Sequence, residues 1–178
     1  MSRAALGVTA ATREDTAVPS VFSVATPFPG RLAVIERPRG GDWLERDMAA
    51  LRRLGVDTLV SALVDEELRD TWLEAEEALA TAAGINFRRL PIANLGTPRG
   101  AAAEHVLREL AAEVLEGRFV VAHCFASVGR SPLIVASIMV MLGADPDFAW
   151  EEIELSRGRQ VPDTREQREW VRRFIPAD

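Results

Sequence analysis

The only cysteine of the chain, Cys124, stands with Arg130 between two apolar segments. The segment 118–123 reads as a buried strand, and 131–143 reads as a helix that is apolar on every side. The residues between them include three with small or no side chains, at Ala126, Ser127 and Gly129. Such a segment lets backbone N–H groups turn inward around an anion, and the following helix N-terminus adds partial positive charge. Because the guanidinium of Arg130 binds two oxygens at once, the pattern predicts a phosphate-sized binding loop.

The same positive field favours the thiolate form of Cys124. A thiolate at the floor of a phosphate-binding loop is a nucleophile directed at phosphorus. Two other interpretations remain open. Cys124 would be a small buried hydrophobic residue if the loop binds nothing. The second interpretation is a Cys–His hydrolase in which Cys124 pairs with His105, although no residue that would orient the histidine is evident.

Composition limits the remaining possibilities. A chain of 178 residues with 48% hydrophobic residues predicts one globular domain over 21–178, after a disordered leader at 1–20. The net charge of −6 argues against a nucleic-acid partner, and no segment is long and apolar enough to span a membrane. A single cysteine fits a cytoplasmic location, and together with only two histidines it predicts no metal site and no cofactor.

Strand-like and helix-like segments alternate along the chain. Strands are expected at 31–36, 56–63, 85–92 and 118–123, and helices at 42–55, 65–84, 97–116, 131–143, 146–156 and 163–174. This order predicts an α/β fold in which helices flank a central, mostly parallel sheet. Cys124 would then lie at the carboxyl end of a central strand, where open α/β sheets bind ligands. The four tryptophans are expected to pack in the core or at its rim: Trp43, Trp72, Trp150 and Trp170.

The motif His123-Cys124, five residues, Arg130, Ser131 resembles the H-C-x5-R-[ST] signature of the protein tyrosine phosphatase superfamily. The short chain resembles the dual-specificity branch, and the resemblance covers roughly 25–175. The segments LRRLGVDTLVSALVDEEL, PIANLGTP and HCFASVGRS are similar in order and spacing to the group of cyclin-dependent-kinase-associated phosphatases and their bacterial relatives.

The resemblance implies a role for each matching residue. Cys124 would become a phosphocysteine, Arg130 would bind two phosphate oxygens, and Ser131 would donate a hydrogen bond to the sulfur in the second step. His123 would brace the loop and help to keep the thiol ionised. Glu67 would anchor the arginine, and Gln167 would lie near the mouth of the site. The phosphate-binding amides would be those of Phe125, Ala126, Ser127, Val128, Gly129 and Arg130.

Asn94 departs from the family pattern. In the segment PIAN the family usually has an aspartate that protonates the leaving oxygen, and an asparagine cannot serve as that general acid. Either the enzyme is slow on poor leaving groups, or another carboxyl replaces the missing acid. The residues considered for that role are Asp65, Glu67 and Asp163.

The sequence therefore favours a cysteine-dependent phosphatase acting on a phosphorylated protein or peptide. Phosphotyrosine is favoured over phosphoserine because a phenolate leaves more readily than an alkoxide. The loop contains no lysine, which argues against highly charged phosphoinositides. The alternative is a pseudophosphatase that binds phosphorylated partners. A third possibility is a rhodanese-like sulfur transferase or an arsenate reductase. The sequence does not predict an oligomeric state.

Overall fold

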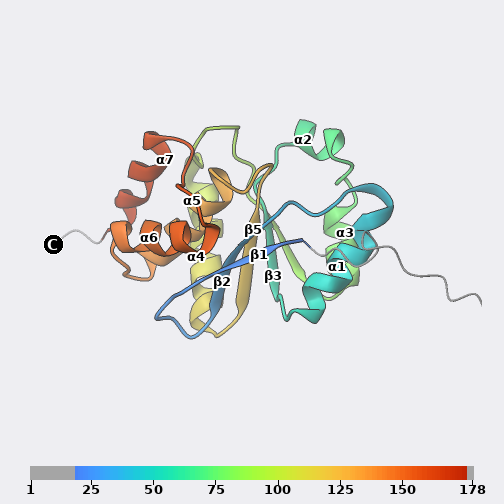
Figure 1. Ribbon diagram of the computed structural model, residues 1–178, viewed down its shortest axis with the longest axis horizontal. Helices are drawn as coiled ribbons and strands as arrows, with labels where there is room; N and C mark the ends of the chain where they lie inside the picture. Colours follow the sequence, from blue (N-terminus) through green and yellow to red (C-terminus); the bar gives the residue numbers. More distant parts are fainter. Residues whose placement is uncertain (1–18, 176–178) are drawn as a thin grey trace, which may run out of the picture.

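A five-stranded sheet forms the centre of the computed structural model, which describes residues 19–175 (Figure 1). The strands are β1 (Val21–Val24), β2 (Arg31–Ile35), β3 (Thr58–Ser61), β4 (Asn86–Arg89) and β5 (Phe119–His123). Their order is β1-β2-β5-β3-β4, with β1 antiparallel to β2 and all other pairs parallel. The predicted mostly parallel sheet is confirmed. The strand β1 was not predicted, and the leader expected at 1–20 falls almost entirely outside the described residues.

Helices cover both faces of this sheet (Figure 1). The helices α1 (Leu44–Arg53) and α3 (Glu76–Ala82) enclose one hydrophobic cluster, and the short helix α2 (Asp65–Asp70) lies above it. The opposite cluster is built from α4 (Gly100–Leu115), α5 (Arg130–Met141), α6 (Pro146–Arg157) and the 3-10 helix η3 (Val171–Phe174). Because helices cover both faces, the central strands β3 and β5 are fully buried, whereas the edge strand β4 is half-buried and carries Asn86, Arg88 and Arg89.

The central strand β5 fixes where the cysteine lies. All of its residues are buried, and it pairs with β2 on one side and β3 on the other. Cys124 follows directly at its carboxyl end. The next helix, α5, is buried from Arg130 to Val140, which explains why its sequence has no polar face. The site therefore stands between two almost entirely buried elements.

The expected helix at 65–84 is wrong, because the structure divides it into α2 and α3. Trp72 takes a left-handed φ of 58° between them, and its carbonyl accepts a hydrogen bond of 3.0 Å from the N–H of Gly41. Gly40 lies so close to the carbonyls of Thr71 and Trp72 that a Cβ there would clash with both. A close backbone contact with a distant segment therefore interrupts a pattern that is continuous in sequence. Trp72 is 73% exposed, which contradicts its expected packing.

Two helix starts also differ from expectation. The helix α4 begins at Gly100 rather than at Pro98, so the segment 91–99 stays irregular over the carboxyl edge of the sheet. The helix α7 (Arg165–Trp170) begins after Thr164, which caps it through a hydrogen bond of 3.1 Å from the N–H of Gln167. Both changes lengthen loops at the edge where Cys124 lies.

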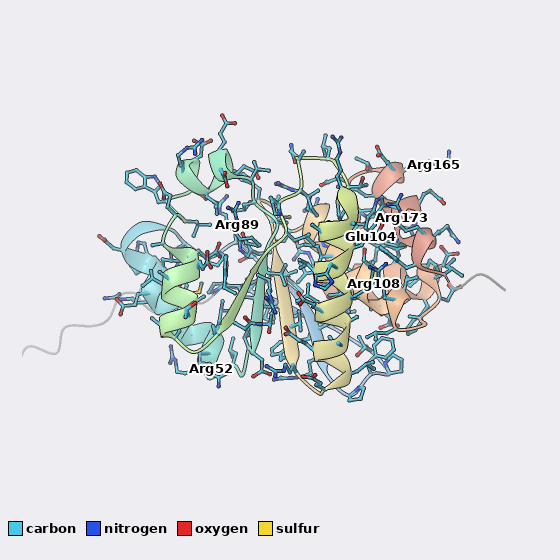
Figure 2. All side chains as sticks on the ribbon, turned by 180° about the vertical axis from the view of Figure 1, so that it is seen from behind. Arg52, Arg89, Glu104, Arg108, Arg165 and Arg173 are labelled. Atoms are coloured by element: carbon cyan, nitrogen blue, oxygen red, sulfur yellow. The ribbon has the colours of Figure 1, made fainter. Side chains whose placement is uncertain are left out.

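Charged side chains cover the outer helices, as Figure 2 shows for Glu104 and Arg108 on α4. Glu104 forms ion pairs with Arg108 at 3.2 Å and with Arg173 at 3.9 Å. Within residues 19–175, no helix combines the length and the apolar character needed to cross a bilayer.

The helical layer behind the site should carry a large share of the stability. Leu107 is fully buried on α4, whereas Leu155 on α6 is 74% exposed. Leu107→Ala should lower the free energy of unfolding by about 2–5 kcal/mol, because it removes buried methyl groups and leaves a cavity. The matched Leu155→Ala should change it by less than about 0.5 kcal/mol. Urea unfolding measures both, and equal losses would contradict the assigned burial.

Candidate active site

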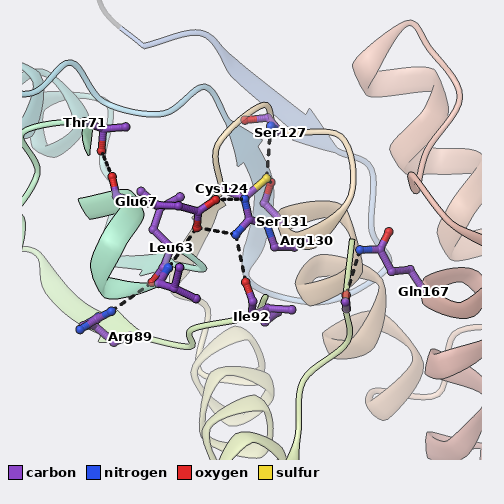
Figure 3. Close-up of polar contacts among 12 residues, drawn as sticks. Leu63, Glu67, Thr71, Arg89, Ile92, Cys124, Ser127, Arg130, Ser131 and Gln167 are labelled. Atoms are coloured by element: carbon purple, nitrogen blue, oxygen red, sulfur yellow. Dashed lines mark hydrogen bonds and ion pairs between the residues drawn. The ribbon is translucent and has the colours of Figure 1, made fainter. Parts of the chain in front are cut away.

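The loop 124–130, here called the cysteine loop, joins β5 to α5 and surrounds the sulfur of Cys124. The residue Cys124 is 2% exposed. Its Sγ accepts a hydrogen bond from the backbone N–H of Ser127 at 3.2 Å and one from Oγ of Ser131 at 3.3 Å (Figure 3). Hydrogen bonds to a sulfur favour its charged form. The sulfur therefore lies beside two hydrogen-bond donors.

Ser127 holds the cysteine loop in its turned conformation. It takes a left-handed φ of 57°, which is unfavourable for a residue with a side chain. Its hydroxyl donates to the carbonyl of Ile35 at the end of β2 at 2.5 Å, and its own carbonyl accepts from Nε of Arg157 at 3.0 Å. Arg157 also stacks over Phe22, 3.8 Å from the ring centroid. These contacts compensate for the strained backbone.

Sequence reasoning missed Arg157 as a support of the cysteine loop. The residue ends α6, 30 positions beyond Ser127, and no motif marks it. Burial, together with the charge of Arg159, lowers the pKa of Arg157. Only the packing of α6 against β1 brings its guanidinium to the loop. No local signal in the sequence could have identified it.

Arg130 is held by a bidentate pair with Glu67. Its two terminal nitrogens donate to the two carboxylate oxygens at 2.7 and 2.8 Å, and one also donates to the carbonyl of Ile92 at 2.9 Å (Figure 3). The structure thus places Glu67 where the resemblance expects an anchor. Arg130 itself is 3% exposed, so its guanidinium is fixed before any ligand arrives.

The pKa values of this pair shift in opposite directions. Burial alone would raise the pKa of Glu67, but hydrogen bonds from Arg130 and Val64 and the charges of Arg130 and Arg37 leave it lowered. Burial alone would lower the pKa of Arg130, but Glu67 and the nearby sulfur of Cys124 raise it. Both groups are therefore charged at neutral pH. Glu67 is unsuited to donate a proton, which removes it from the candidate acids.

A hollow of about 380 Å³ opens above the sulfur. Two of the side chains around it are apolar and exposed, Leu95 at 53% and Phe125 at 50%. Arg37 stacks over Phe125, 4.4 Å from the ring centroid, and adds positive charge beside the hollow. The residues that surround it are Glu67, Asn94, Leu95, Cys124, Phe125, Ala126, Val128, Gly129, Arg130 and Asp163.

Asn94 and Asp163 reach this hollow from two different loops. The loops are tied together by Gln167, whose Nε2 donates to the carbonyl of Gly96 at 2.9 Å (Figure 3). Gln167 is fully buried, so it acts beneath the rim rather than at the mouth. The carboxylate of Asp163 lies directly over Gly129, and a Cβ at that position would clash with it. The absence of a side chain at Gly129 therefore leaves room for the carboxylate at this place.

His123 lies on the other face of the sheet from Cys124. Side chains alternate along β5, and that of His123 points to α3, where Nε2 approaches Oε1 of Glu76 to 2.7 Å. Both side chains are buried, and the approach lacks the geometry of a standard hydrogen bond. The expected effect of His123 on the thiol stays a prediction, since its partner in the structure is Glu76.

Two candidates from the sequence lie away from the hollow. Asp65 pairs with Arg89 at 2.8 Å and is not among the residues that surround the hollow. His105 is on the outer face of α4, 3.5 Å from Glu109, with 73% of its side chain exposed. Within 19–175, no group of three or more potential ligands is placed to hold a metal ion. The structure does not bring His105 and Cys124 together as a hydrolase pair.

Comparison with known proteins identifies the family of the chain. A family model described as "Swiss Army Knife protein, DSP-PTPase phosphatase domain" matches residues 20–173. The chain therefore belongs to this family of dual-specificity-type phosphatase domains. No curated protein matches its sequence.

Several solved structures share the fold. Kinase-associated phosphatase aligns with a TM-score of 0.78 and 19% identity, over 89% of this chain and 95% of its own. Tk-PTP aligns with a TM-score of 0.66 and 25% identity, over 82% and 91%. TpbA of P. aeruginosa aligns with a TM-score of 0.55 and 26% identity, over 88% and 90%, and its cysteine-to-serine variant was solved in complex with phosphotyrosine.

The lowered pKa of Glu67 predicts a pH-dependent contribution to stability. A lowered folded-state pKa stabilises the fold above the ordinary value of 4.5, and the contribution is lost as pH falls through the folded value. Glu67→Gln should therefore lower the free energy of unfolding by about 1 kcal/mol at neutral pH. The difference from wild type should shrink toward about pH 3.

Urea unfolding across this pH range measures the effect. The control is Glu66→Gln, which removes an exposed carboxylate from the same turn of α2. A difference between Glu67→Gln and wild type that does not change with pH would contradict the lowered pKa.

Proposed function

We propose that the protein is a cysteine-dependent phosphatase that hydrolyses phosphotyrosine in proteins or peptides through a phosphocysteine intermediate. The observation that supports this most is the arrangement around Cys124. Its sulfur accepts two hydrogen bonds and lies beside Arg130, which Glu67 and Ile92 already hold in place. A fixed guanidinium and a turned loop bind a phosphate dianion without reorganising during the reaction.

The mechanism has two steps. The thiolate of Cys124 attacks phosphorus, a sulfur–phosphorus bond forms, and the bond to the tyrosine oxygen breaks. Water then attacks the phosphocysteine and releases phosphate and the thiolate. Ser131 donates to Sγ at 3.3 Å, so its hydroxyl can stabilise the thiolate as it leaves in the second step. Arg130 and the amides of the cysteine loop stabilise the charge on phosphorus in both steps.

The surroundings of the hollow favour an aryl phosphate. Leu95 and Phe125 offer apolar surface to a phenyl ring, and Arg37 adds positive charge for a phosphorylated ligand. A phenolate leaves more readily than an alkoxide, which matters because Asn94 cannot protonate the leaving oxygen. The complex of the related TpbA variant with phosphotyrosine supports the same preference. We further place the protein in the cytoplasm, where a reducing environment keeps its lone Cys124 a free thiol.

A pseudophosphatase is the second candidate, and Asn94 is the observation that favours it. The side chain lines the hollow, and its amide hydrogens are not acidic enough to be transferred to a leaving oxygen. Such a protein would bind phosphorylated partners and turn them over negligibly. Hydrolysis of 2,4-dinitrophenyl phosphate, whose leaving group needs no proton, distinguishes the two functions directly.

Cys124→Ser should abolish phosphate release from phosphotyrosine peptides, with a loss of at least about 10⁴-fold. A serine hydroxyl is not ionised at neutral pH, so the nucleophile is lost while the binding loop remains. The measurement is phosphate release from matched phosphotyrosine and phosphoserine peptides, with peptide affinity measured by calorimetry. Retained turnover in the variant would contradict a phosphocysteine intermediate.

Ser131→Ala should slow the breakdown of the phosphocysteine more than its formation. The expected signature is a burst of aryl alcohol equal to the enzyme concentration, followed by a slower steady state. Rapid-mixing kinetics with 2,4-dinitrophenyl phosphate measure it, and Ser137→Ala on the same helix is the control. Ser137 bonds only to the carbonyl of Leu133 among the described residues, at 2.6 Å. An unchanged time course in Ser131→Ala would remove this residue from the second step.

A further inference from the structure

The site has a nucleophile and a phosphate-binding loop, but the loop that should supply the acid supplies Asn94. We propose that Asp163, on the loop before α7, donates the proton to the leaving oxygen in place of Asn94. This inference rests on the proposed phosphatase function and identifies a further catalytic residue for it.

The first argument is elimination among the carboxyls near the sulfur. Glu67 and Asp163 are the only acidic residues among those described that surround the hollow. Glu67 is bound at both oxygens by Arg130 and remains ionised. Asp65 is paired with Arg89 and lies outside the hollow. Asp163 is thus the one described carboxyl that reaches the site without an ion-pair partner.

The second argument is position. The carboxylate of Asp163 lies against Gly129, the last residue before α5, where a Cβ would collide with it. It faces the same hollow as Asn94 and Cys124. A proton donor must come within hydrogen-bond reach of the leaving oxygen, and that oxygen departs on the side of phosphorus away from the sulfur. Asp163 is exposed, so its side chain can turn toward that oxygen.

The third argument is support. Thr164 and Gln167 bond reciprocally at the start of α7, at 3.1 and 3.3 Å, and fix the residue next to Asp163. The buried Gln167 also bonds the carbonyl of Gly96, two residues after Asn94. The Asp163 loop is therefore anchored to the very loop whose acid is missing. Such anchoring keeps a catalytic group within the small range of positions that catalysis needs.

The charges and atoms balance in this scheme. In the first step the carboxylic acid of Asp163 gives its proton to the tyrosine oxygen as the oxygen–phosphorus bond breaks. In the second step the carboxylate takes a proton from the attacking water as the sulfur–phosphorus bond breaks. Asp163 thereby returns to its starting form, and Cys124 leaves as the thiolate.

The test compares two esters that differ in their need for a proton, phenyl phosphate and 2,4-dinitrophenyl phosphate. Asp163→Asn should lower kcat/KM, which reports only the first step, by about 10²-fold on phenyl phosphate, with a much smaller effect on the dinitrophenyl ester. Adding Asn94→Asp to Asp163→Asn should restore much of the loss, because it returns an acid to the neighbouring loop. The control Glu166→Gln removes an exposed carboxylate three residues along the chain and should behave as wild type.

The outcomes are distinct. Equal losses of kcat/KM on the two esters in Asp163→Asn would mean that Asp163 acts only through the structure of the site. Unchanged values of kcat/KM on both esters would mean that Asp163 donates no proton. Either result overturns the inference and leaves the proposed phosphatase function intact. Inhibition by vanadate, measured in each variant, reports whether the phosphate-binding loop is preserved. A wild-type protein inert toward both esters would overturn the phosphatase itself, and with it the acid.

Discussion

The bidentate pair between Arg130 and Glu67 is the interaction on which the site depends. It joins the first turn of α5 to the first turn of α2, two helices on opposite faces of the sheet. A buried guanidinium without a partner would be costly, and Glu67 supplies two charge-assisted hydrogen bonds. The carbonyl of Ile92 accepts a third hydrogen bond from the guanidinium. The arginine is thereby oriented before a phosphate binds, and none of the binding energy is lost in ordering it.

The cysteine loop shows how strain is offset by distant contacts. Ser127 takes a left-handed conformation so that its N–H points to the sulfur of Cys124. Such a conformation persists only where the surroundings hold it, and here β2 accepts from the hydroxyl while Arg157 binds the carbonyl. The nucleophile's environment therefore depends on α6 and β2 as much as on the motif itself. Fold stability and the geometry of the site are coupled through these contacts.

Asn94 and Asp163 face one hollow from two loops that are far apart in the sequence. Two loops meet over the sulfur, and Gln167 ties them together beneath the rim. A proton donor on either loop would face the same oxygen. Under the proposed mechanism, an acid on either loop would serve the same cysteine and the same phosphate-binding loop. The hydrogen bond from Gln167 is what makes the two positions neighbours.

The sequence by itself determined that Cys124 and Arg130 lie between a central buried strand and a buried helix. This follows from local rules, since the apolar runs before Cys124 and after Arg130 and the small residues between them are contiguous in the chain. Alternating segments likewise predicted the mostly parallel sheet, and the resemblance placed Glu67 beside the arginine. Only the tertiary structure decided which distant residues meet there. Contacts between remote segments produce the helix break at Trp72, the hydrogen bond from Arg157 to the cysteine loop and the approach of Asp163 to Gly129. A local pattern contains no information about such contacts, because packing overrides local preference wherever two backbones must pass closely.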